Sequence, residues 1–198
     1  MSNSIEYQLL EKTKRSHRGT LFFVESFSKI ANTKAVNKAL ERLVISGELE
    51  RVATGIYVRP VIDDYIGKVL PSIEEIAVAI AKRDRATIVP TGSYALYKLG
   101  LTTQVPLNIV FYSDTSARKI KIGKQTITFK KASSKNLSFI GKISTLAIQA
   151  LRTIGKDQTT AEEILQIKKI LKNENPKHLQ HDLQLAPVWI RKLIATNE

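Results

Sequence analysis

The sequence contains no cysteine, and this absence excludes three kinds of chemistry together. Disulfide bonds, thiolate metal sites and cysteine nucleophiles all need that side chain. Only three histidines occur among 198 residues, and His17 lies far in sequence from the other two, His178 and His181. That pair shares a helix face, where we interpret it as solvent-facing and not as a metal site. We therefore expect no metal site, no cofactor and no catalytic residue.

Long apolar runs are also missing. No stretch approaches the roughly 18 apolar residues that a membrane helix requires. The opening MSNSIEYQLLEK lacks the basic segment and the apolar stretch of a secretory signal. Hydrophobic residues make up 43% of the chain and charged residues 25%, the balance of a folded globular protein. We expect a cytoplasmic protein with no membrane span.

Acidic residues are scarce, with 18 Asp and Glu against 31 Lys and Arg, a formal net charge of +13. The excess is concentrated in residues 68–141, where 12 basic residues face 4 acidic ones. No acidic residue occurs between Asp114 and Asp157. A solvated positive face is one interpretation, but so long a stretch without acids favours a surface that contacts phosphates of a nucleic acid. The predicted phosphate contacts are Arg118, Lys119, Lys121, Lys124, Lys130 and Lys131.

The first sixty residues predict three helices followed by a β-hairpin. Ile5, Leu9 and Leu10 indicate a first amphipathic helix, and Phe27 and Ile30 have helical spacing in the second. The third and best-defined helix follows the N-cap candidates Asn32 and Thr33, ends before Gly47 and carries one apolar stripe, Val36, Leu40, Leu43 and Val44. Two β-like runs, 48–52 and 56–61, are joined by Ala53-Thr54-Gly55, which predicts the hairpin.

This order is typical of a winged helix-turn-helix. We therefore predict an α+β chain, with a winged helix-turn-helix DNA-binding domain at 1–67 and a basic, mixed α/β domain at 68–198 that has a small sheet and C-terminal helices. Because the stripe buries one side of the third helix, its polar side chains project from the other side, which can enter the major groove of DNA. The predicted DNA contacts are Arg15, Arg18, Thr33, Lys34, Asn37, Lys38, Arg42, Arg51, Thr54 and Arg59.

The chemistry of these side chains suggests separate roles. Asn37 has the groups to pair with an adenine, and Arg42 those to pair with a guanine or a phosphate. The hairpin residues Arg51, Thr54 and Arg59 are expected to follow the backbone or the minor groove. Glu41 shares the exposed face, where it either accepts a hydrogen bond from a cytosine or pairs with a lysine one turn away.

The second half of the chain alternates predicted helices and strands. A capping box at Ser72 and Glu75 opens one helix, and another starts at Thr91-Gly92-Ser93. Strand-like runs occupy 86–89, 107–112, 118–122 and 126–130. A continuous apolar stripe that begins at Lys142 predicts another helix. A second capping box, at Thr160 and Glu163, opens a helix that we expect to end at Pro176. A last helix follows Pro187.

Three enzyme motifs are incomplete or missing in the sequence. Gly92-Ser93 followed by an apolar strand is similar to the start of a nucleotidyltransferase fold, whose strand carries two acidic residues for Mg²⁺, but Asn108 and Val110 stand at those places here. Neither a phosphate loop nor a G-x-S-x-G elbow is present.

Tyr94 and Tyr97 are interpreted as packing residues, with stacking on a base as the alternative.

Three segments together resemble one known family. They are KAVNKALERLVISGELERVATGIY from Lys34, PTGSYALYKLGLTTQVPLNIVFYSD from Pro90 and RKIKIGKQTITFKK from Arg118, within residues 15–135. The chain is similar to the AbiEi-like antitoxin and transcriptional-regulator family, of the type IV toxin–antitoxin systems that act in bacterial abortive infection. It departs from that family at Phe23, where a Thr or Ser usually caps the second helix, and the tail after Lys142 matches weakly.

The resemblance implies a repressor that binds operator DNA of its own operon through the winged helix. It also implies a basic second domain that counters a nucleotidyltransferase-like toxin without a stable toxin–antitoxin complex. Two alternatives stay open. In one, the chain is a non-catalytic interaction module whose second domain binds RNA or an acidic protein while the wing is structural. In the other, the chain retains transferase activity.

Overall fold

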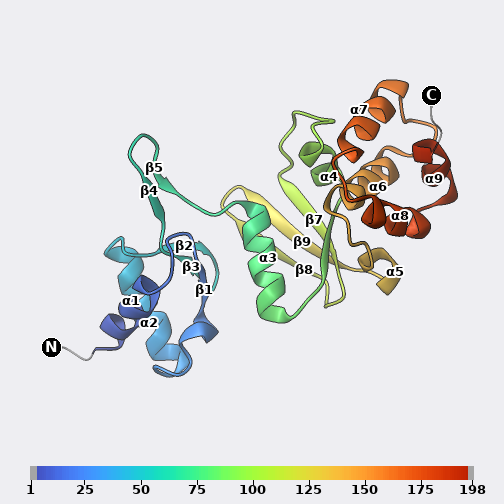
Figure 1. Ribbon diagram of the computed structural model, residues 1–198. Helices are drawn as coiled ribbons and strands as arrows, with labels where there is room; N and C mark the ends of the chain where they lie inside the picture. Colours follow the sequence, from blue (N-terminus) through green and yellow to red (C-terminus); the bar gives the residue numbers. More distant parts are fainter. Residues whose placement is uncertain (1–3, 196–198) are drawn as a thin grey trace. The chain divides into compact units, whose positions relative to one another are not determined.

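The computed structural model describes residues 4–195, and the chain divides into two compact units, Met1–Ala79 and Ile80–Glu198 (Figure 1). The division falls inside helix α3 (Ile73–Asp84), whereas the sequence placed a boundary between residues 67 and 68. Within the described part of the chain, no helix has both the length and the apolar character that crossing a bilayer requires.

The first unit contains short helices and two small antiparallel sheets. Its elements are α1 (Ile5–Lys14), β1 (Leu21–Phe23), the 3₁₀ helix η1 (Val24–Phe27), α2 (Thr33–Ile45), β2 (Glu50–Ala53), β3 (Ile56–Val58), β4 (Val61–Asp63) and β5 (Gly67–Val69). The first sheet has the strand order β1-β3-β2, and β4 and β5 form a two-stranded sheet. The hairpin β2–β3 turns through Thr54 and Gly55, and Gly55 has a φ of +73°.

The caps of α2 confirm the local prediction for this helix. Asn32 is the N-cap residue, and its Oδ1 accepts a hydrogen bond from the backbone N–H of Ala35 at 3.0 Å. Gly47, just past the end, has a φ of +78°, the left-handed conformation that favours glycine. The buried stripe of α2 packs with Leu9 of α1, Phe27 of η1 and Tyr57 of β3. This shared core fixes α2 against both α1 and the β2–β3 hairpin.

One prediction for the first unit was wrong. The expected second helix is a short strand followed by one 3₁₀ turn, because residues 21–23 pair with β3, with Phe22 opposite Tyr57. Phe23 is the residue before that turn, where its backbone N–H donates to Ser26 Oγ at 3.1 Å. Residues 61–69 form a second hairpin, β4–β5, whose turn is fixed by Asp63.

The second unit places helices around a four-stranded mixed sheet. Its remaining elements are β6 (Ile88–Thr91), α4 (Ser93–Lys98), β7 (Asn108–Ser113), β8 (Arg118–Ile122), β9 (Gln125–Lys131), α5 (Ser134–Leu137), α6 (Lys142–Ile154), α7 (Ala161–Leu171), α8 (Pro176–Leu185) and α9 (Val188–Ala195). The strand order is β6-β7-β9-β8, with β7 and β9 parallel and the other pairs antiparallel. The α+β class is confirmed by these two units.

The predicted capping boxes are confirmed, and one helix boundary was wrong. Ser72 and Glu75 exchange hydrogen bonds at the start of α3, as do Thr160 and Glu163 before α7. Pro176 does not end a helix; it is the first residue of α8, where its missing N–H costs nothing. The strand expected at 86–89 lies at Ile88–Thr91, and α5 was not predicted.

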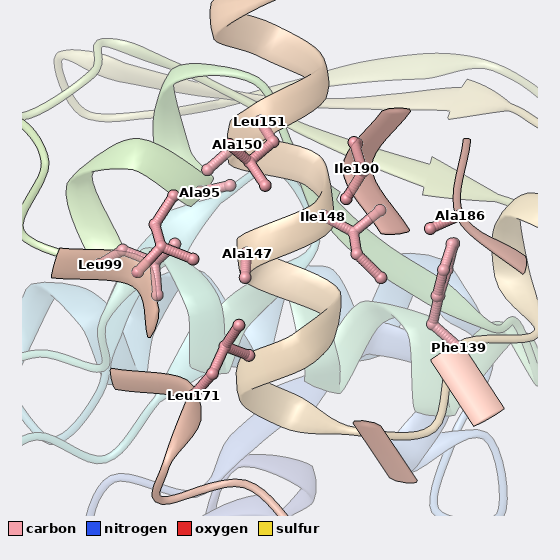
Figure 2. Packing of buried hydrophobic residues seen from close by; sticks show 11 residues of the cluster. Ala95, Leu99, Phe139, Ala147, Ile148, Ala150, Leu151, Leu171, Ala186 and Ile190 are labelled. Atoms are coloured by element: carbon pink, nitrogen blue, oxygen red, sulfur yellow. The ribbon is translucent and has the colours of Figure 1, made fainter. Parts of the chain in front are cut away.

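Helix α6 is the centre of the second core. Figure 2 shows its residues Ala147, Ile148, Ala150 and Leu151 directed toward different neighbours, among them Ala95 and Leu99 from the α4 segment and Ile190 of α9. Small residues on α6 let the neighbouring helices approach closely. The C-terminal helices α7, α8 and α9 gather around it (Figure 1).

Two carboxylates cover the N-terminus of α6. Asp182 of α8 is fully buried; its Oδ1 accepts from the Ile140 N–H at 2.9 Å and its Oδ2 from the Gly141 N–H at 2.9 Å and from Ser144 Oγ. Glu174 Oε2 accepts from the N–H groups of Ile143 and Ser144 at 2.7 and 3.0 Å. These side chains satisfy helix-terminal donors that α6 itself leaves without partners.

Candidate nucleic-acid interface

Helix α2 and the β2–β3 hairpin border one groove of about 690 Å³. Four of the predicted DNA contacts line it: Thr33 and Asn37 from α2, and Arg51 and Thr54 from the hairpin. All four side chains are exposed. The fold thus brings two segments that are separate in sequence to one surface.

The groove carries acidic as well as basic side chains. Glu25 and Glu41 line it together with Arg51. Within residues 4–195 Glu41 makes no ion pair, so the interpretation of Glu41 as the partner of a lysine one turn away is not observed. The groove itself therefore does not have the strong positive charge of a phosphate site. Lys34 and Lys38, both exposed on the same helix, supply positive charge outside its lining.

Lys38 and Arg42 lie on the α1 side of the helix. Both line a smaller hollow shared with Ser4 and Glu6, and Arg42 Nη1 lies 3.8 Å from Glu6 Oε2. Both partners are well exposed, so this ion pair contributes little to stability and leaves Arg42 able to turn outward. Asn37 and Arg42, which the sequence assigned to one reading face, thus occupy opposite flanks of α2.

Three other predicted contacts lie away from the groove. Arg15 follows α1 and lines a separate hollow with Tyr7 and Glu11. Arg18 Nη1 donates to the carbonyl oxygen of Pro60 at 2.9 Å, next to Arg59. Because β1 and β3 are antiparallel, Arg18 and Arg59 sit at the end of β3 opposite the Thr54–Gly55 turn. The structure does not bring these arginines to the groove.

Two polar residues of the groove lining were not anticipated from the sequence. Glu25 reaches it from η1, and Tyr57 contributes from β3 opposite Arg51. Glu25 is placed by the pairing of β1 with β3, which has no local sequence signal. Tyr57 was hard to anticipate because all three residues of β3 are buried. The strand therefore lacks the alternation of buried and exposed residues that marks a surface-facing side chain. In the sequence, the aromatic character of Tyr57 was the only sign that it could line a surface.

The predicted phosphate contacts of the second unit divide between the two faces of the sheet. Lys119 and Lys121 of β8 are register partners of Thr128 and Thr126, and Lys130 lies two residues further along β9. Since neighbouring residues of a strand point to opposite faces, Lys119, Lys121 and Lys130 share one face. Arg118 and Lys131 belong to the other, and Lys124 is in the β8–β9 turn. One nucleic-acid backbone cannot contact all six directly from one side.

Arg118 has partners inside the unit. Its guanidinium hydrogen-bonds Asp84 Oδ2 and lies over the Phe129 ring, 5.1 Å from the centroid. Burial of Asp84 acts to raise its pKa, but hydrogen bonds from Arg83 and Arg118 outweigh burial and hold that pKa below its ordinary value. The half-buried Arg118 therefore fastens β8 to the end of α3, while the five lysines of the predicted set are exposed.

Asn108, Tyr94 and His181 make structural contacts. Asn108 Oδ1 accepts a hydrogen bond from Thr128 Oγ1 at 2.7 Å, and Tyr94 is buried with its ring centroid 5.9 Å from that of Phe111. Tyr94 thus packs in the core, as interpreted. His181 Nδ1 lies 2.9 Å from Asp182 Oδ1. From residue 4 to residue 195, no group of three or more His, Asp or Glu side chains is arranged to hold a metal ion.

A family model matches residues 8–179, which span most of both units and include the groove and the lysine-bearing strands. The chain belongs to the DUF6088 family. This is described as a family of unknown function. No curated protein matches the chain. Among solved structures, this DUF6088 chain is similar to the Rv2827c protein of Mycobacterium tuberculosis, with 12% identity and a TM-score of 0.48 over 98% of this chain and 82% of that one.

Proposed function

We propose that this chain is a DNA-binding transcriptional regulator whose first unit is a winged helix-turn-helix. The order helix, strand, 3₁₀ turn, helix, hairpin and the β1-β3-β2 sheet support this assignment. In this proposal α2 enters the major groove of a duplex, and the β2–β3 hairpin is the wing that follows the neighbouring backbone.

The observation that carries the proposal is the groove shared by α2 and the hairpin. It brings Thr33, Asn37, Arg51 and Thr54 together as exposed side chains on a surface that the core of the unit holds rigid. Asn37 offers the donor and acceptor that adenine requires, and Arg51 offers a cation beside it. Glu41 on the same surface accepts from the amino group of a cytosine and repels a misplaced phosphate, which favours reading of bases over general attraction.

The second unit adds contacts that do not depend on sequence. Lys119, Lys121 and Lys130 share a face of the sheet, and no acidic residue lies within 115–156 to offset them. Each phosphate that such a lysine neutralises contributes about 0.9 to the slope of log affinity against log salt. The net charge of +13 speeds encounter with any nucleic acid.

The resemblance to AbiEi-like antitoxins extends the proposal to a biological role. In that role the chain represses its own operon in a bacterium and counters a nucleotidyltransferase-like toxin without forming a stable complex with it. It acts without a cofactor and is not itself an enzyme. A pull-down with the neighbouring gene product tests the toxin relationship, and stable capture would contradict this part.

The decisive experiment selects duplexes that bind the full chain from a pool of random sequence. The proposal expects one enriched motif, which also occurs upstream of the gene. Recovery of duplexes without any shared motif would contradict sequence-specific regulation. A parallel selection from random RNA tests the second candidate, an interaction module that uses the basic sheet face, and a motif found only among the RNAs would favour it.

A further inference from the structure

Ile45, the last residue of α2, is a large apolar side chain that the fold leaves in water. It is 80% exposed, whereas Val36, Leu40 and Leu43 of the same helix are buried. Isoleucine is also a weaker helix former than alanine or leucine, so neither packing nor helix formation requires it at this position. A single exposed apolar residue is common on protein surfaces, and its place in the fold decides what it can contact.

Ile45 lines the same groove as the residues that we propose to read bases. Asn37, Glu41 and Ile45 follow one another at intervals of four residues, so they form one stripe along α2. All three side chains are exposed, and all three line the groove. The half-buried Val24 and Val44 also line it. One side of α2 thus presents an amide, a carboxylate and an aliphatic side chain in sequence.

The chemistry of the major groove restricts what an aliphatic side chain can recognise there. The edges of the bases present hydrogen-bond donors and acceptors, with which Ile45 makes no hydrogen bond. The apolar group on these edges is the C5-methyl group of thymine, and contact with an apolar side chain is the way in which proteins read it. Cytosine and uracil lack this methyl group. The ligand that fits Ile45 is therefore a thymine of a DNA duplex.

We propose that Ile45 contacts the methyl group of a thymine and so adds one required base to the sequence that α2 reads. This inference rests on the proposed function and names a base that the groove selects. Asn37 and Ile45 are separated by two turns of helix, which is about 12 Å along its axis. Successive base pairs follow at about 3.4 Å. The thymine is therefore expected within about four base pairs of the adenine that Asn37 reads.

Replacement of single thymines by deoxyuridine tests the contact. The change removes one methyl group and keeps the base pair, and it is made in turn at each thymine of a duplex selected by the full chain. Fluorescence anisotropy at fixed salt measures the affinity. The wild-type chain is expected to bind about fourfold more weakly when one particular thymine is replaced, because burial of one methyl group contributes about that factor. A series in which no replacement changes the affinity would overturn the contact.

The variant Ile45→Ser assigns the effect to this residue. It is expected to bind the thymine duplex and its deoxyuridine counterpart equally, because the methyl group has lost its apolar neighbour. Ile62→Ser is the matched control, since Ile62 is a 51% exposed isoleucine in β4 that is not part of the groove lining. The control is expected to keep the difference of about fourfold. A difference that persists in Ile45→Ser would overturn the assignment.

These measurements separate a failure of the methyl contact from a failure of the proposed function. An enriched motif in which no thymine responds to deoxyuridine, or in which the response does not depend on Ile45, leaves DNA reading in place and overturns the methyl contact alone. A selection that enriches no motif overturns the proposed function and the methyl contact with it. An enriched motif with one thymine whose methyl group matters to the wild-type chain and to Ile62→Ser, but not to Ile45→Ser, supports both.

Discussion

Removal of the Asp182 carboxylate is expected to destabilise the protein more than most single changes. Asp182→Ala removes the acceptor of the Ile140 and Gly141 N–H groups and the nearer acceptor of the Ser144 hydroxyl, which keeps only Glu174 Oε2 at 3.4 Å. A buried donor left without a partner costs ~1–3 kcal/mol. Two of these groups lie at the helix terminus, where a side chain can relax and water can enter. We therefore expect a loss of about 4 kcal/mol in the free energy of unfolding.

Urea unfolding followed by circular dichroism measures this loss. For a chain of this length about 3 °C of melting temperature accompanies each kcal/mol, so a drop of roughly 12 °C is expected in a thermal scan. Asp157→Ala is the control, because Asp157 is exposed, and a shift within about 0.5 kcal/mol is expected there. A loss below about 1 kcal/mol for Asp182→Ala would refute the reasoning that this carboxylate caps α6.

The other predictions concern the same cap of α6 and the face of the sheet that carries Lys119, Lys121 and Lys130. Gly141→Ala is expected to cost about 2 kcal/mol in urea unfolding, since a Cβ there would lie 2.1 Å from Ser144 Oγ and 2.7 Å from Glu174 Oε2; stability equal to wild type would contradict it. Burial acts to raise the pKa values of Glu174 and Asp182, but hydrogen bonds outweigh it and hold both pKa values below the ordinary range. The stability that these two carboxylates contribute is therefore present above the ordinary carboxyl pKa and is lost as the pH falls through the lowered pKa values. Urea denaturation at several pH values measures this loss. A free energy of unfolding that stays constant from neutral to strongly acidic pH would contradict the expectation. Lys119→Gln/Lys130→Gln is expected to lower the salt slope of DNA affinity by up to about 1.8 without changing sequence preference, and an unchanged slope would remove this face from the DNA contact.

Local signals were sufficient for α2 and its ends and for the starts of α3 and α7. The stripe from Val36 to Val44 with Asn32 before it and Gly47 after it specified α2, because caps and periodicity act within a few residues. The capping boxes at Ser72 and Thr160 succeeded for the same reason. The turn at Thr54–Gly55 also followed from adjacent residues. These elements include most of the groove lining, so the four groove residues among the predicted contacts were accessible from sequence.

Features that depend on distant pairing were not accessible. Phe27 and Ile30 have helical spacing, but the residues before them, 21–23, form a strand because β3 lies beside them. Lys119 and Lys131 appear equivalent in the sequence, and only the register of β8 with β9 places them on opposite faces of the sheet. Asp182 lies 38 residues from Ser144, so no local pattern marks it as a cap. Arg118 gave no sign of its pairing with Asp84, which is 34 residues away.

The groove between α2 and the β2–β3 hairpin is proposed to read a duplex, and one affinity ratio tests this role. The ratio compares a selected duplex with a scrambled one, measured by fluorescence anisotropy at fixed salt for the wild-type chain, Asn37→Ala and Lys34→Ala. Asn37→Ala is expected to lower this ratio by about tenfold or more, because a base contact is lost, while Lys34→Ala is expected to weaken binding of both duplexes alike. An unchanged ratio for Asn37→Ala would contradict the assignment of this groove as the reading surface.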